Sequence, residues 1–224
     1  DHEAALGRYG ELLSLRPDHR DALAFCRAHD EARGDHRSVA VLLCRAAEAT
    51  GEPLARAELH RQIARIAETR LGDLDFAITH WRQVVELCPS DSAPRTELKR
   101  LLAQAERWQE VTQVLLSDVS RSLRPEEKVP VYRELARVAQ EHLHDDKAAC
   151  SHLRNALQLC PDDPEVLDQL ARVYERLGQW RELAAVLQRH AELNEGARRA
   201  ELLHRGARVL FVNSGRGEEA LQLC

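Results

Sequence analysis

The sequence predicts an all-α protein in which antiparallel helix pairs stack into a solenoid. Pro17, Pro89 and Pro161 recur at a spacing of 72 residues, and each follows an apolar helical stretch. Within each copy, apolar residues recur at i, i+3, i+4 and i+7 through four segments, which predicts two helix pairs per copy. Aromatic residues make up only 4% of the chain, and aliphatic residues with Arg and Glu dominate, as is typical of closely packed helices.

Amphipathic periodicity places the helices in order along the chain. Gly34, Gly72 and Gly178 lie between expected helices, and Pro53 and Pro125 suit first helical turns. Short turns predict that consecutive helices run antiparallel. The expected helices cover residues 3–15, 19–33, 36–49, 53–70, 74–87, 92–105, 107–121, 126–142, 145–159, 163–177, 179–193, 197–213 and 216–224.

The repeat register predicts a single solenoid over residues 1–224. One helix pair cannot bury its own apolar faces, so stability must come from stacking on the next pair. The first helix aligns at an offset of 72 with the second helix of a later pair, so we expect a fragment of a longer array. Residues 1–16 are the second helix of a truncated repeat, helix pairs occupy 17–51, 52–89, 90–124, 125–161 and 162–195, and residues 196–224 form a last, truncated repeat.

Composition and charge exclude several functional classes. A net charge of −5 gives no overall field toward nucleic acid or an anionic membrane surface. The longest apolar runs, such as residues 39–44, are far shorter than the roughly 20 residues of a membrane span. The six cysteines form no CxxC pair, so we expect free thiols and a cytoplasmic location. The strong preference for Arg over Lys favours a bacterial source.

Two motifs resemble the tetratricopeptide repeat. The first-helix pattern of that family is matched by Leu170, Ala171, Tyr174, Gly178 and Trp180. The second-helix pattern and its closing proline are matched by Ala149, Leu153, Ala156 and Pro161. Alternate units depart from the pattern: Val39, Val111 and Leu183 replace the small residue expected early in the second helix. The resemblance implies a right-handed superhelix whose concave groove is lined by first helices and binds protein segments.

The same resemblance places a basic stripe in the groove. Arginine binds carboxylates through two parallel hydrogen bonds, so the stripe would suit an acidic helix or loop of a partner. The alternative is an ordinary solvated face, neutralised by nearby glutamates at Glu58, Glu68, Glu141 and Glu175. The candidate partner-binding residues are Arg61, Arg65, Arg100, Arg133, Arg137, Arg172, His204 and Arg208.

Other chemically suggestive residues receive structural interpretations. Trp108 and Trp180 recur at a spacing of 72 at helix starts, which favours a packing role over partner anchoring. The residues His142 to Asp146 suit a surface turn better than a metal site. No nucleophile elbow, HExxH motif or phosphate-binding glycine loop is present. We therefore expect no catalytic residue, no metal and no cofactor.

These observations predict a protein-interaction scaffold or adaptor and no enzymatic activity. By analogy alone, its partner would be a small GTPase or a motility, secretion or assembly component. Pentatricopeptide arrays have a similar period and bind RNA, which makes RNA binding an alternative, although the acidic balance disfavours it. A further alternative is a regulatory array within a larger enzyme. Insertion into a membrane is not expected.

Overall fold

A computed structural model describes residues 2–121 and 124–214 of the chain. Over these residues every regular element is a helix, joined to the next by a short turn, and there is no strand. The prediction of an all-helical fold is confirmed. The chain divides into two compact units, residues 1–107 and residues 108–224.

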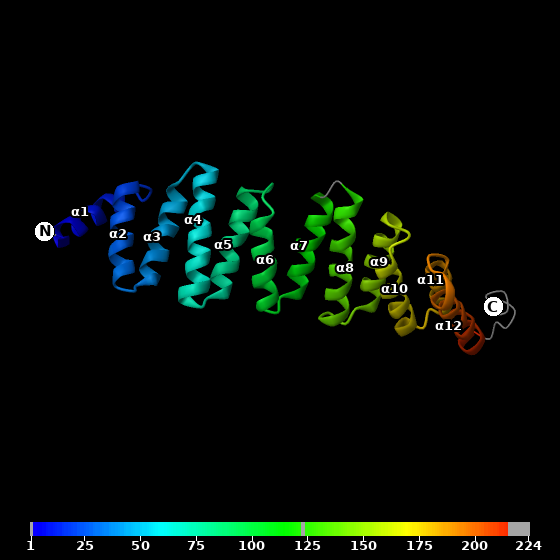
Figure 1. The fold of residues 1–224 in the computed structure, drawn as a ribbon. Coiled ribbons are helices and arrows are strands. Elements are labelled where there is room, and N and C mark those ends of the chain that lie inside the picture. The colour runs from blue at the N-terminus through cyan, green and yellow to red at the C-terminus, as the bar shows by residue number, and fades with distance from the viewer. Residues whose placement is uncertain (1, 122–123, 215–224) are drawn as a thin grey trace. The chain divides into compact units, whose positions relative to one another are not determined.

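Residues 2–107, the described part of unit 1, form six α-helices, and each helix packs on the next along the chain (Figure 1). Consecutive helices within the unit run antiparallel, as the short turns require. The helices are α1 (His2–Leu15), α2 (Arg20–Ala32), α3 (His36–Ala49), α4 (Pro53–Ile66), α5 (Leu74–Leu87) and α6 (Ala93–Gln104), with a π-helical turn η1 (Ala67–Leu71) that follows α4.

Unit 2 repeats this arrangement. Its core extends continuously from α8 to α12, so each of these helices buries one face against its neighbours. The helices described in this unit are α7 (Trp108–Arg121), α8 (Pro125–Glu141), α9 (Asp146–Leu159), α10 (Pro164–Leu177), α11 (Trp180–Glu192) and α12 (Gly196–Ser214).

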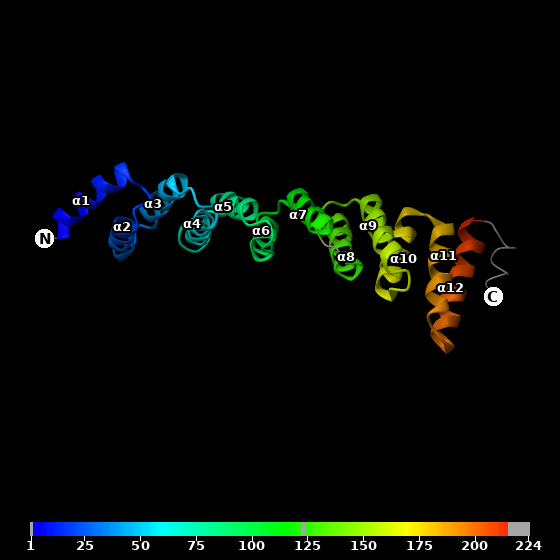
Figure 2. The ribbon, with the colours of Figure 1, turned by 90° about the horizontal axis from the view of Figure 1, so that it is seen from above.

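The helices of unit 1 form two layers. Figure 2 shows α2, α4 and α6 in one layer and α1, α3 and α5 in the other. The first layer holds the first helix of each predicted pair, and the second holds the second helices. The first helices of this unit therefore lie next to one another in one layer.

Aspartates set the start of three second helices. The carboxylate of Asp35 accepts a hydrogen bond from the Ser38 backbone N–H at 3.0 Å. Asp73 and Asp145, which are 72 residues apart, each accept an equivalent bond at 2.9 Å. Each bond satisfies a backbone donor that the first helical turn leaves unpaired. The repeat therefore conserves its turn chemistry from copy to copy within this chain.

The core consists of small and aliphatic side chains, as the composition predicts. In unit 1, Val39, Leu43 and Ile63 are buried together between α3 and α4. In unit 2, Leu153 and Leu170 are fully buried in the core that joins α9 to α10. These contacts follow chain order, because each helix pair covers the apolar face of the next.

The helix ends differ little from the predicted ones, with one informative exception. A single helix was expected at residues 53–70, but α4 ends at Ile66 and the π-helical turn η1 follows it. Gly72 then ends the turn with φ of 67°, a backbone conformation that glycine adopts without steric cost. The expected helix at 216–224, with Cys224, lies outside the described residues, and the grouping into repeats remains a prediction.

Candidate functional site

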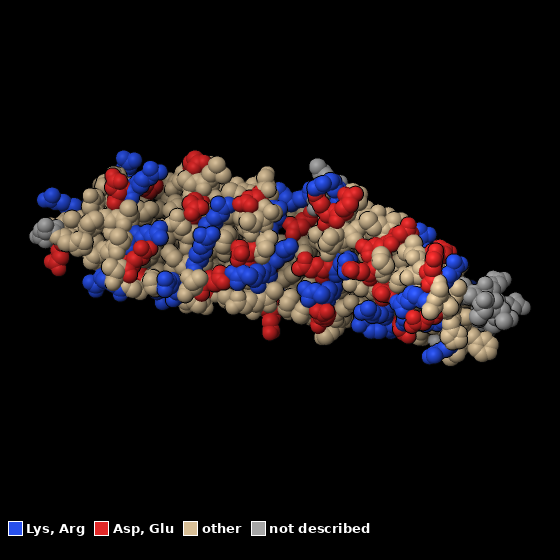
Figure 3. Space-filling view, viewed as in Figure 1, with Lys and Arg blue, Asp and Glu red and all other residues tan. Residues whose placement is uncertain are grey.

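The predicted basic residues all lie on first helices of the two units. In unit 1, Arg61 and Arg65 are on α4 and Arg100 is on α6. Unit 2 carries the remainder, on α8, α10 and α12: Arg133, Arg137, Arg172, His204 and Arg208. Figure 3 shows that positive and negative side chains alternate over the face in view. Whether an arginine is available to a partner protein therefore depends on whether a carboxylate of this chain already pairs with it.

Two arginines of unit 1 form ion pairs between successive helix pairs. Arg61 on α4 contacts Asp91, in the turn before α6, at 2.7 Å. Arg100 on α6 contacts both carboxylate oxygens of Glu68 in η1, at 2.7 and 2.8 Å, and also pairs with Glu97. A guanidinium held by two carboxylates has little free capacity for a third. These two arginines therefore hold adjacent pairs in register.

Arg133 behaves in the same way in unit 2. It joins α8 to α10 through an ion pair with Glu165. Arg137, one turn further along α8, pairs only with Glu141 on its own helix, at 3.0 Å. Both Arg137 and Glu141 are more than half exposed, and such a pair contributes little because water screens it. Arg137 therefore remains able to exchange Glu141 for another carboxylate.

The remaining basic residues are exposed. Over residues 2–121 and 124–214, no carboxylate lies within ion-pair distance of Arg65, Arg172 or Arg208. His204 is exposed as well. The structure thus separates the predicted stripe into arginines engaged between helix pairs and arginines that face solvent.

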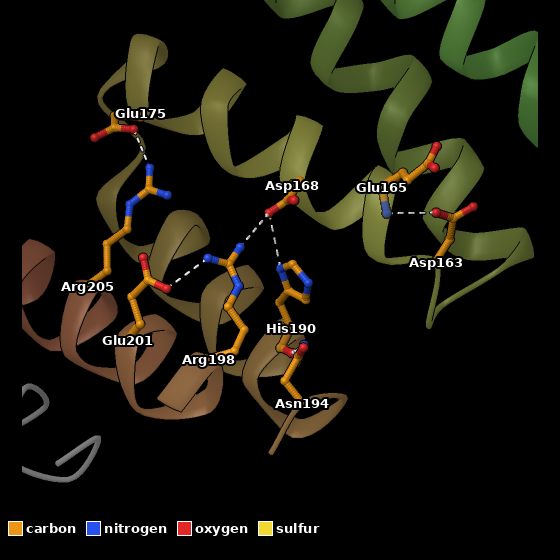
Figure 4. A network of polar contacts seen from close by, with 9 residues as sticks. All are labelled: Asp163, Glu165, Asp168, Glu175, His190, Asn194, Arg198, Glu201 and Arg205. Carbon is orange, nitrogen blue, oxygen red and sulfur yellow. Dashed lines mark hydrogen bonds and ion pairs between the residues drawn. The ribbon is translucent and has the colours of Figure 1, made fainter. Parts of the chain in front are cut away.

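An additional charge network in unit 2 escaped the sequence analysis. Asp168 on α10 lies 3.3 Å from His190 on α11 and 3.8 Å from Arg198 on α12 (Figure 4). Glu175 on α10 pairs with Arg205 on α12 at 2.6 Å. Several such pairs join residues about 30 positions apart, and that recurring separation is the signal that would have revealed them.

The tryptophan at the start of α7 has a packing role. The Trp108 indole stacks on the imidazole of His142, at the end of α8, with ring centroids 3.4 Å apart. Trp180 packs against the core of unit 2, close to Gly178. Both side chains are partly buried. These contacts agree with the interpretation of both residues as packing elements.

A partly buried polar cluster lies between α3, α4 and α5, with His80 buried at its centre. The Nδ1 atoms of His60 and His80 are 2.8 Å apart, and the His80 Nε2 atom lies 3.8 Å from the Cys44 sulfur. Burial, and then the neighbouring His60, lower the pKa of His80 to about 4. Burial also lowers the pKa of His60. Both rings are therefore neutral at physiological pH, and one donates its proton to the other.

The turn at His142 to Asp146 has structural partners. His142 stacks on Trp108, Asp145 caps α9, and Asp146 pairs with Arg176 at 2.7 Å. Over the described residues, no group of three or more His, Cys, Asp or Glu side chains is arranged to hold a metal ion. None of the helices described there is both long and apolar enough to span a membrane.

Comparison with known proteins identifies the repeat. Residues 166–201, which include α10 and α11, match the family model described as tetratricopeptide repeat. Over these residues the chain carries a tetratricopeptide-like repeat, which confirms the resemblance there. No match was found among curated proteins.

Three solved structures are among those that resemble this chain. A crystal structure of MamA is 17% identical, with a TM-score of 0.46, over 78% of this chain and 89% of that one. YrrB, described as a tetratricopeptide repeat protein with an unusual peptide-binding site, is 17% identical, with a TM-score of 0.45, over 75% and 82%. PilF of Pseudomonas aeruginosa is 19% identical, with a TM-score of 0.42, over 99% and 91%.

Proposed function

We propose that the chain is a non-catalytic scaffold that binds partner proteins, with Arg137, Arg172 and Arg208 as its main contact residues in unit 2. Stacked helix pairs present extended surfaces, and tetratricopeptide-like repeats serve in general as protein-binding modules. The partner would offer an acidic helix or loop, because planar guanidinium groups recognise carboxylates through paired hydrogen bonds.

The observation that supports this proposal is a repeated exposed arginine at one register of three first helices. Arg137 on α8, Arg172 on α10 and Arg208 on α12 are exposed, and none forms an ion pair with another helix of the described chain. Neighbouring helices in such arrays pack about 8–10 Å apart, so an acidic segment could meet successive arginines. Arg65 occupies the same register on α4 in unit 1.

The other predicted residues contribute differently in this proposal. Arg61, Arg100 and Arg133 keep helix pairs in register through Asp91, Glu68 and Glu165, and reach a partner only by exchanging those carboxylates. His204 lies one turn before Arg208 on α12 and would border the surface.

A quantitative pull-down tests the proposal. The full chain is compared with a variant carrying Arg137→Glu, Arg172→Glu and Arg208→Glu, by mass spectrometry of the captured proteins. A matched control carries Arg→Glu at Arg8, Arg16 and Arg45, which are also exposed. We expect the unit 2 variant to lose partners that the control retains. Equal capture by both variants would contradict the assigned surface, and salt-sensitive capture of RNA would support the alternative.

We further propose that the protein works in a reducing compartment, such as the bacterial cytoplasm. The cysteines Cys26, Cys44, Cys88, Cys150 and Cys160 are free thiols, which supports this location. Cell fractionation with an antibody against the chain would test it directly, and recovery from an oxidising compartment would contradict it.

A further inference from the structure

A polar hollow lies beside α9, which is a second helix of the predicted pairs. None of the first-helix arginines Arg137, Arg172 and Arg208 is among its lining residues. Its volume is about 420 Å³, and the turn between α10 and α11 closes one side. We call it the α9 hollow. The lining residues that matter here are Lys147, Ser151, Arg154, Asn155, Gln158 and Gln179.

The hollow carries two positive charges without matching negative ones. Over the described residues, no carboxylate lies within ion-pair distance of Lys147 or Arg154, and both side chains are exposed. Asp146, next to Lys147, is engaged by Arg176 at 2.7 Å. Glu182 is close enough to influence the buried Cys150, but it forms no ion pair with Arg154. The α9 hollow therefore has a net positive field.

The other copy of the repeat gives an internal comparison. Seventy-two residues before Lys147 and Gln179 stand Asp75 and Arg107. In unit 1 these two residues form an ion pair at 2.8 Å, which neutralises the equivalent position. In unit 2 the acidic member has become lysine and its arginine partner has become glutamine. The replacement removes an internal ion pair and leaves a cation facing the hollow.

Helix stability does not account for this lysine. Lys147 lies in the first turn of α9, where the helix dipole favours negative charge. A lysine there costs a few tenths of a kcal/mol or more relative to the aspartate of the other copy, by the usual dipole energies of about 0.3–1 kcal/mol. An external anion that pairs with Lys147 would offset this cost.

The geometry of the hollow suits a peptide rather than a single small anion. Lys147 and Arg154 are seven residues apart on one helix, which is about 10 Å along its axis. Carboxylates two or three positions apart on an extended chain are separated by roughly 7–10 Å. Between the cations lie Ser151 and Asn155, whose hydroxyl and amide groups can both donate and accept hydrogen bonds, as a peptide backbone requires.

We propose that the α9 hollow binds an extended acidic segment of a partner protein. Lys147 and Arg154 pair with its carboxylates, and Asn155, Gln158 and Gln179 bind its main chain. This site is separate from the first-helix arginines of the proposed function. It would give the scaffold a second contact on a different set of helices.

The test uses the full chain and a short fluorescein-labelled peptide of alternating Glu and Ser, titrated by fluorescence anisotropy. To remove the contribution of first-helix arginines, the chain carries Arg137→Gln, Arg172→Gln and Arg208→Gln. In this background, Lys147→Asp combined with Gln179→Arg rebuilds the ion pair of unit 1, and Arg154→Gln removes the second cation. The control is Arg199→Gln, an exposed arginine of α12 that changes the net charge by the same amount as either test.

We expect each test variant to weaken peptide binding about tenfold or more, as loss of a charge-assisted hydrogen bond does. The Arg199→Gln control should bind the peptide as tightly as the background chain does. A peptide of alternating Gln and Ser should bind neither the background chain nor the control. Circular dichroism verifies that each variant remains helical. The proposal is overturned if the control weakens binding as much as the tests do, or if neither test variant has an effect. The proposal is also overturned if inorganic phosphate displaces the labelled peptide as effectively as unlabelled Glu/Ser peptide does, since the hollow would then recognise anions in general.

Discussion

Trp108 and His142 stack face to face, with ring planes only 6° apart and centroids separated by 3.4 Å. The contact joins the start of α7 to the end of α8. It packs the indole at the start of one helix against the end of the next.

A double-mutant cycle on this pair should give a measurable coupling. We expect Trp108→Ala and His142→Ala each to lower the free energy of unfolding, and the pair to couple by about 0.5–1.5 kcal/mol beyond the loss of buried area. Urea denaturation, followed by circular dichroism, measures the free energy of unfolding of the unchanged chain, the two single variants and the double variant. Strictly additive effects would show that the stacking contributes nothing.

The His60 and His80 pair predicts a pH-dependent stability in unit 1. Folded His80, with a pKa of about 4, stays neutral where the unfolded side chain, with a usual value of 6.5, takes up a proton. The resulting stability is present above about pH 6.5 and is lost as the pH falls toward 4, by at most about 3 kcal/mol. Arg56, facing His60, and the Cys44 thiol supply no negative charge at these pH values.

Denaturation of the His80→Gln variant at pH 7 and pH 4.5 checks this account. The variant should lose much of the difference in stability between the two pH values that the parent shows. His204→Gln, at an exposed site on α12, serves as the control and should retain the parental difference. An unchanged difference in the His80 variant would assign the effect to other groups.

Core leucines should be far more sensitive to truncation than exposed ones. Leu153 is fully buried in unit 2, so Leu153→Ala should cost about 2–5 kcal/mol through lost burial and the cavity left behind. Leu54 is 67% exposed, and Leu54→Ala should change stability by less than about 0.5 kcal/mol. Thermal unfolding of the two variants measures this difference, and similar melting shifts would contradict the assigned packing.

The cysteines should react with alkylating agents at different rates. Burial raises the pKa of the Cys26 and Cys150 thiols, and both side chains are buried. At pH 8 they should therefore react with iodoacetamide more slowly than the partly exposed Cys88 and Cys160. Time-resolved peptide mass spectrometry gives the four rates. Fast labelling of Cys150 would show that α9 and α10 separate readily.

Local chemistry made most helix ends predictable. Asp35, Asp73 and Asp145 cap helices where the sequence places an aspartate after a turn, and Gly178 ends α10 in a left-handed conformation. The π-helical turn after α4 was not predictable, because its residues have the same apolar periodicity as a continued α-helix. A π-helical turn has the same kinds of residues as an α-helical one, so the amino-acid composition does not reveal it.

The charge partners of the arginines were only partly predictable. The tetratricopeptide resemblance placed Arg61, Arg100 and Arg172 on first helices, but it could not say which of them meets a carboxylate from the next pair. Whether an ion pair forms depends on how far the arginine side chain extends toward the neighbouring helix pair, as in the contact of Arg100 on α6 with Glu68 in η1. Comparing Lys147 with Asp75, its counterpart 72 residues earlier, reveals the change of charge from sequence, but the hollow itself is visible only in the structure.

Site-specific photocrosslinking in the source cell tests the central claim most directly. A photoreactive phenylalanine derivative at Arg172, with Arg137 and Arg208 intact, should form a covalent adduct with a partner protein. The same group at the exposed Arg45 of α3 should not. An adduct at position 172 alone would support the assigned binding surface. Equal adducts at both positions, or none at position 172, would contradict it.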